Sequence, residues 1–150
     1  MIDVAAPTAE AMRLDPLTVE ERGRRMALVR GRDTKPELCV RRLVHGLGYR
    51  YRLCSGRLPG RPDLVFSSRR KVIFVHGCFW HQHPSALCKL ARMPKSRLEF
   101  WKKKLLSNRE RDQVTLRALG EIGWNSLVVW ECQLREVDDL KERIRSFLES

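Results

Sequence analysis

The chain has 150 residues, 43% of them hydrophobic, and its 30 Lys and Arg against 18 Asp and Glu give a formal charge of +12. This suffices for one domain with a core, and the basic excess favours a polyanionic partner, of which nucleic acid is the commonest. No run approaches the roughly 18 to 20 apolar residues of a membrane-spanning helix, and an odd number of cysteines without a secretory signal favours a reducing, cytoplasmic setting over a disulfide framework.

The first part of the chain predicts an arm and two helices. Residues 1–17 are expected to be a flexible arm, and residues 18–150 a single domain. Thr18 to Glu21 has the pattern of a capping box and opens a short basic helix. Thr34 to Glu37 is a second helix start, with a proline in the first turn.

The middle of the chain alternates between strand patterns and loops. Residues 49–53, 63–66 and 71–75 are expected to form strands, the last two joined as a hairpin by a polar turn. Residues 76–95 show no clear period, which predicts a long loop.

The last part predicts a helix, a strand and a helix. Ser96 to Glu99 resembles a third capping box, which would open a helix to about Leu119. Residues 124–130 are expected to form a buried strand, and an amphipathic helix follows. The order of elements predicts an α/β protein with a mixed β-sheet flanked by helices.

The loop after the second strand of the hairpin is rich in metal-binding side chains. Cys78, His83 and Cys88 lie in it, and Cys132 follows the last strand. Three thiols and an imidazole would suit tetrahedral zinc, and the alternative is a set of free buried cysteines with a surface histidine. Cys39 and Cys54, with no histidine nearby, are expected to be structural.

A second group of side chains is suited to acid–base chemistry. Asp63 starts a strand after a basic loop, where its carboxylate would suit Mg²⁺ or simply be a turn residue. Glu37 would support such a site or only cap its helix. His81 and His76 are proton carriers, and Asp112 would orient an imidazole if its helix packs against the loop.

Adjacent aromatic residues in a polar loop point to a third function. Phe79 and Trp80 cannot easily both enter a core, and Trp101 directly precedes three lysines. Apolar wedges beside phosphate-binding lysines are what unstacks a DNA duplex.

Several motifs together resemble one protein family. They are "RRMALVRGRDTKPE" (24–37), "LPGRPD" (58–63), "VIFVHGCFWHQH" (72–83), "EFW" (99–101), "NRERD" (108–112) and "GWNSLVVWEC" (123–132). In this order they resemble the very short patch repair DNA mismatch endonucleases, from about residue 24 to 134. The sequence departs from the family at Val75, where threonine is frequent, and in the loop after His83, which places Cys88 further along.

The resemblance implies a restriction-endonuclease-like core and a role for each matched residue. Asp63 would bind catalytic Mg²⁺, His81 would activate water with Asp112 as its partner, and His76 and Glu37 would support the site. Structural zinc would be held by Cys78, His83, Cys88 and Cys132. The residues implied to contact DNA are Phe79, Trp80 and Trp101 as the wedge, with Arg24, Arg25, Arg61, Lys102 and Lys103.

The implied reaction is a nick in one strand of double-stranded DNA, on the 5′ side of the thymine in a T:G mismatch left by deaminated 5-methylcytosine. A monomer would suffice, with mismatch-repair proteins and a DNA polymerase as implied partners and no membrane involved. The alternatives are a restriction-like Mg²⁺ nuclease that cuts both strands, and a zinc-stabilised DNA-binding module without activity.

Overall fold

The computed structural model describes residues 17–29, 31–53 and 56–150. The expected arm, apart from Leu17, and Cys54 therefore lie outside the described residues. The elements, in chain order, are α2 (Val19–Ala27), α3 (Lys35–Gly46), β1 (Leu64–Phe66), η1 (Ser67–Arg69), β2 (Lys71–His76), η2 (Lys89–Ala91), α4 (Leu98–Glu121), β3 (Asn125–Trp130), η3 (Glu131–Arg135) and α5 (Val137–Glu149).

The described strands form one mixed sheet in the order β1-β2-β3. β1 pairs antiparallel with β2 through Leu64↔Ile73, as the hairpin prediction required. β2 pairs parallel with β3, from Lys71↔Asn125 to His76↔Trp130, and α4 is the crossover between them. This confirms the predicted mixed sheet flanked by helices.

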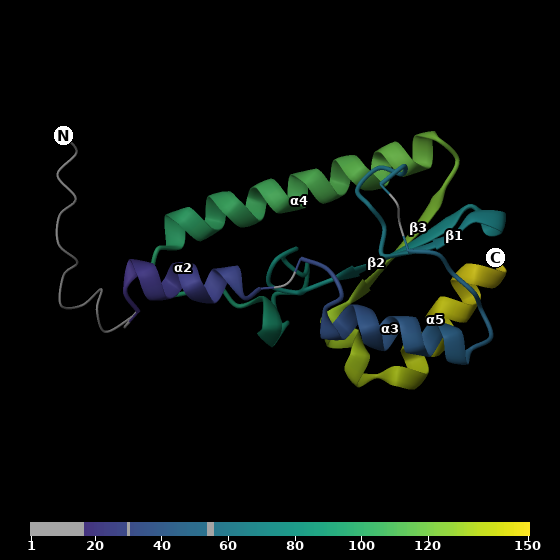
Figure 1. The fold of residues 1–150 in the computed structure, drawn as a ribbon, viewed down its shortest axis with the longest axis horizontal. Helices are drawn as coiled ribbons and strands as arrows, with labels where there is room; N and C mark the ends of the chain where they lie inside the picture. The colour runs from purple at the N-terminus through teal and green to yellow at the C-terminus, as the bar shows by residue number, and fades with distance from the viewer. Residues whose placement is uncertain (1–16, 30, 54–55) are drawn as a thin grey trace.

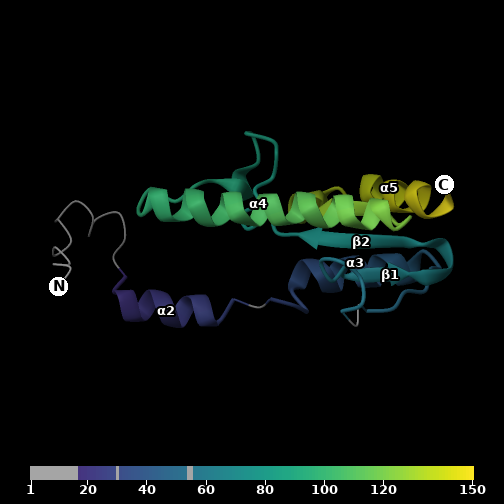
Figure 2. The ribbon, with the colours of Figure 1, turned by 90° about the horizontal axis from the view of Figure 1, so that it is seen from above.

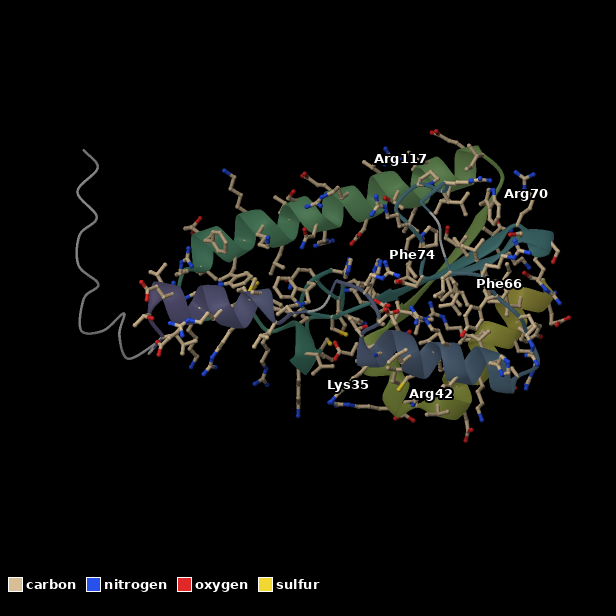
Figure 3. The ribbon with its side chains drawn as sticks, in the orientation of Figure 1. Lys35, Arg42, Phe66, Arg70, Phe74 and Arg117 are labelled. Carbon is tan, nitrogen blue, oxygen red and sulfur yellow. The ribbon has the colours of Figure 1, made fainter. Side chains whose placement is uncertain are left out.

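Helices cover both faces of the sheet (Figures 1 and 2). Because side chains alternate along a strand, Ile73 and Val75 of β2 pack on one side with α3 and α5, around Ile144. Val72 and Phe74 pack on the other side with Leu119 of α4. Figure 3 labels Phe66 and Phe74, one from each of these two clusters.

Two of the three expected capping boxes begin helices. The Thr18 hydroxyl accepts the Glu21 N–H while the Glu21 carboxylate accepts the Thr18 N–H, which is a complete capping box. The Thr34 hydroxyl likewise accepts the Glu37 N–H. The third prediction was wrong: α4 begins after Arg97, which has a φ of 52°, and no side chain caps it.

Two strand predictions need correction. Residues 49–53 form no strand; only Arg52 makes an isolated bridge, exchanging both backbone hydrogen bonds with Val65. β3 was expected to be buried, but Val129 is its single buried residue, whereas all three residues of the other edge strand, β1, are buried.

Arg70 fixes the hairpin turn to the end of α4. It adopts a φ of 52°, donates from Nη2 to the Ile122 carbonyl at 2.7 Å, and lies over the Trp124 ring. Figure 3 shows Arg70 where the turn meets α4. This contact sets where the crossover helix lies on the sheet.

α2 and the N-terminal half of α4 extend beyond the sheet in the same direction (Figures 1 and 2). α2 has no buried residue. No helix among the described residues is long and apolar enough to cross a membrane.

Candidate active site and metal site

Asp63 lies at the start of β1 and is held across the hairpin. Its N–H donates to the Ile73 carbonyl at 3.1 Å, and its Oδ2 accepts the Val75 N–H at 2.6 Å. Burial raises the pKa of this carboxyl to about 6; the Val75 hydrogen bond opposes the shift, and the negative charge of Glu37 adds to it.

The loop before Asp63 packs tightly on α4. Gly60 has a φ of +72°, and a Cβ at this position would overlap the Thr115 methyl group and lie 2.9 Å from its hydroxyl oxygen. Arg61 follows with a φ of 49°, and Pro62 is fully buried. The glycine therefore allows the close approach that places Asp63 beside α4.

His81 forms a pair with Asp112 of α4. Its Nδ1 lies 2.6 Å from Asp112 Oδ2, so α4 does pack against the loop, the condition on which the pairing depended. A proton on Nδ1 in this hydrogen bond leaves Nε2 to accept one. Val75, whose N–H donates to the Asp63 carboxylate, lines the same cavity as His81, so the two groups border one site.

His76 is a buried, neutral ring beneath His81. The two rings stack with centroids 3.8 Å apart and an interplanar angle of 6°. Burial, and then the charge of His81, lower the pKa of His76 to about 4. Its Nδ1 is buried without a hydrogen-bond partner among the described residues. A neutral His76 adds no second positive charge against the His81 ring.

Glu37 faces the same site from α3. Its Oε2 accepts the Asp33 N–H at 2.8 Å and lies 3.4 Å from the Arg41 guanidinium. Glu37, Val75 and His81 line one cavity of about 510 Å³. The structure therefore brings together all five predicted acid–base residues: Glu37, Asp63, His76, His81 and Asp112.

Sequence reasoning missed two side chains that hold this site. Arg41 pairs with Asp33 at 2.9 Å and with Glu37, one helical turn away. Asn108 donates to the Trp80 carbonyl at 3.0 Å. Asn108 precedes Asp112 by four residues, and this spacing puts both side chains on one face of α4. The spacing is the signal in the sequence that would have indicated Asn108 as a site residue.

The thiols of Cys78, Cys88 and Cys132 lie within 4.8 Å of one another. The Cys132 N–H donates to the Cys78 sulfur at 3.4 Å. Burial raises the pKa of the Cys78 thiol to about 12, so without a cation it keeps its proton. A cluster of three soft donors is suited to Zn²⁺.

His83 lies next to this thiol cluster. It lines a cavity of about 350 Å³ with Cys88 and Cys132, and its Nδ1 accepts the Ser85 N–H at 3.1 Å. Among the described residues, the ligand atoms that lie within 4.8 Å of one another here are the three sulfurs alone, so the structure does not bring a His83 nitrogen into the cluster. Cys39, expected to be structural, is exposed on α3 and takes no part in the core.

Phe79, Trp80 and Trp101 form one aromatic cluster. Their ring centroids lie 5.2 to 5.9 Å apart in edge-to-face arrangements. All three are half-buried, whereas the neighbouring Phe100 is 46% exposed beneath the Arg97 guanidinium. Phe79 and Trp80 lie directly before His81 in the chain, and Trp101 comes from α4.

The basic residues predicted to contact DNA are exposed on three segments around this cluster. Arg24 and Arg25 lie on α2, Arg61 lies in the loop before Asp63, and Lys102 and Lys103 lie on α4. A carboxylate beside a histidine–carboxylate pair, surrounded by exposed basic residues, defines the class of protein as a hydrolytic nuclease.

Comparison with known proteins identifies the family. The family model described as DNA mismatch endonuclease Vsr matches residues 14–87. The chain is 48% identical over 135 residues to the type II nicking enzyme V.XorIIP of Xanthomonas oryzae pv. oryzae, covering 90% of this chain and 97% of the relative. It is 43% identical over 121 residues to the DNA mismatch endonuclease Vsr of Escherichia coli, covering 81% and 76%.

A third relative, the type II nicking enzyme V.NmeAIP of Neisseria meningitidis, is 38% identical over 130 residues, covering 87% of this chain and 91% of the relative. The chain belongs to the Vsr family of DNA mismatch endonucleases. The resemblance drawn from its motifs is confirmed.

Proposed function

We propose that this endonuclease nicks one strand of DNA on the 5′ side of the thymine in a T:G mismatch, with Mg²⁺ as its catalytic metal, and so starts very short patch repair of deaminated 5-methylcytosine. The observation that carries the proposal is the position of the aromatic cluster. Phe79 and Trp80 lead directly into His81, whose partner Asp112 lies on the helix that also carries Trp101.

The residues around Asp63 fit a divalent cation. Two carboxylates, Asp63 and Glu37, repel each other there, and burial raises the pKa of Asp63 to about 6. A cation on Asp63 would offset both the repulsion between the two carboxylates and the cost of burying the charge of Asp63. Mg²⁺ prefers such hard oxygen ligands and, when bound, supplies Lewis-acid stabilisation of charge on the phosphate. The core that holds these groups would be restriction-endonuclease-like.

The proton transfer is assigned to His81. Its Nε2 takes the proton from the attacking water, and Asp112, bonded to Nδ1, stabilises the imidazolium that forms. General-base catalysis of this kind contributes roughly 10²- to 10⁴-fold in rate. His76 holds the ring in position by stacking and stays uncharged.

The thiol cluster is proposed as a structural zinc site. Cys78, His83, Cys88 and Cys132 would supply four ligands, and a site filled by protein ligands has no open position for catalysis. It would fix the loop that carries both His81 and the aromatic cluster. Phe79, Trp80 and Trp101 would insert at the mismatch, while the basic residues of α2 and α4 contact the backbone.

The proposal also covers the cellular setting. A single-strand nick needs one active site, so the protein acts as a monomer on DNA in the bacterial cytoplasm. A DNA polymerase to refill the gap and mismatch-repair proteins are its partners.

The test is a set of labelled duplexes that differ only at one base pair, matched or T:G, with Mg²⁺ or EDTA. The nick should require both the mismatch and Mg²⁺, and should map to the 5′ side of the thymine. Asp63→Asn should abolish it and retain DNA binding, whereas Asp138→Asn, an exposed residue of α5, should change nothing. Equal cutting of matched DNA, or cutting of both strands, would favour a restriction-like nuclease instead.

A further inference from the structure

A second cavity is lined by both members of the His81–Asp112 pair. It measures about 430 Å³, and its walls come from the loop before Asp63 and from α4. Arg61 stands in one wall and Arg111 in the other, with His81 and Asp112 between them. Arg111 was not among the residues expected to contact DNA.

The charge of this cavity suits an anion. Its two guanidinium groups face a single carboxylate, Asp112, which is already hydrogen-bonded to His81. The 510 Å³ cavity, which His81 also lines, has the reverse balance, with Glu37 and Glu131 against Lys35. Of these two cavities that His81 lines, the smaller one therefore favours a phosphate.

Both arginines are held in place by the fold. Arg111 Nη2 donates to Asn108 Oδ1 at 3.1 Å, and Asn108 in turn donates to the Trp80 carbonyl. Arg61 has a left-handed backbone between Gly60 and the buried Pro62. It also lines the cavity that Asp63 lines, so Arg61 borders both cavities.

We propose that this cavity binds a backbone phosphate of the cut strand, the one next to the phosphate that is hydrolysed, through Arg61 and Arg111. Guanidinium groups bind phosphate oxygens through paired, charge-assisted hydrogen bonds. The inference rests on the proposed function, because it takes His81 to mark the phosphate that is cut. Through Asn108, the same contact joins phosphate binding to the backbone that carries Trp80.

The experiment combines single variants with single neutral phosphates. T:G duplexes carry one uncharged methylphosphonate at each position around the nick in turn, and kcat/KM is measured for the wild type, Arg61→Ala and Arg111→Ala. Arg117→Ala is the matched control, because Arg117 is exposed on the same helix and Figure 3 shows it on the edge of α4 away from the sheet. It does not line the cavity.

The kcat/KM of the wild type should fall about 10-fold or more when one phosphate next to the cut phosphate is neutral, as expected for a lost charge-assisted hydrogen bond. Arg111→Ala should reduce kcat/KM by a similar factor on unmodified DNA. On the duplex whose neutral phosphate slows the wild type, Arg111→Ala should show no further reduction. Arg61→Ala should show the same pattern, and Arg117→Ala should behave as the wild type.

Two results would overturn the inference: no loss for the wild type at either neighbouring phosphate, or an equal further loss for Arg111→Ala on the modified duplex. The same comparison is made by DNA binding in EDTA, where no cutting occurs. If the wild type fails to discriminate T:G from matched DNA, the proposed function is wrong, while the interference pattern still decides the phosphate contact.

Discussion

The contact between Gly60 and Thr115 allows a sharp test of how the active site is assembled. Replacing Gly60 with alanine adds one methyl group at a position with a φ of +72°, where it would overlap the Thr115 side chain. Thr115 lies three residues after Asp112 on α4, and Gly60 lies three residues before Asp63. The added methyl group should push apart the two segments that carry the proposed catalytic carboxylates.

The expected cost has two parts. A left-handed backbone costs a residue with a Cβ about 1 to 2 kcal/mol, and overpacking against Thr115 costs about 1 to 3 kcal/mol. The free energy of unfolding should therefore fall by about 2 to 5 kcal/mol. For a domain of this size the melting temperature should fall by roughly 5 to 15 °C. A shift of about 1 Å between Asp63 and His81 would also slow the reaction by about 10²-fold.

The assays are thermal unfolding followed by circular dichroism and single-turnover nicking below the melting temperature. Gly120→Ala is the control, because a Cβ there meets no atom within 4 Å and Gly120 lies in the same helix. It should leave the rate unchanged and raise stability slightly, since alanine is the better helix former. A Gly60→Ala variant with the melting temperature and rate of the wild type would refute the packing argument.

Four further predictions concern the site itself. Because burial raises the pKa of Asp63, its ionisation destabilises the metal-free fold as pH rises from about 4 through 6. The stability advantage of Asp63→Asn over the wild type should therefore grow over this range, by up to about 3 kcal/mol in the free energy of unfolding. A difference in melting temperature that stays constant with pH would contradict this prediction. Asp112→Asn should lower kcat by about 10²-fold or more with unchanged DNA binding, since an amide cannot stabilise the His81 imidazolium; equal losses in binding would point to a structural role. Removing zinc with a chelator, or Cys132→Ala, should lower the melting temperature as well as activity, and zinc analysis that finds no bound metal would count against the site. Trp80→Ala should reduce the preference for T:G over matched DNA more than it reduces total DNA affinity, because stacking is local and phosphate contacts are not; equal losses on both duplexes would exclude the wedge.

Local patterns determined much of this protein. Several features depend on residues within a few positions of one another. They are the N-termini of the two helices capped by Thr18 and Thr34, the hairpin, and the amphipathic face of α5. The loop motif that carries His81 also determined the family, because its residues are contiguous. Such features require no knowledge of the rest of the chain.

Tertiary contacts decided the features that sequence reasoning missed or misjudged. Ser96 to Glu99 has the letters of a capping box, yet the chain enters α4 through the left-handed Arg97 instead. The partial exposure of β3 depends on what other segments cover it, and the strand expected at residues 49–53 is reduced to one bridge at Arg52. Neither outcome is encoded in the residues of those segments alone.

The active site itself belongs to the second category. His81 and Asp112 are separated by 31 positions, and they meet only because α4 packs against the loop. Two contacts far from this pair in the sequence also join α4 to the hairpin segment: Gly60 against Thr115, and Arg70 on the Ile122 carbonyl. The sequence by itself determined which side chains are candidates for the chemistry. Only the tertiary structure decided that they share one site, because contacts between distant segments are set by how helices pack on the sheet and not by local periodicity.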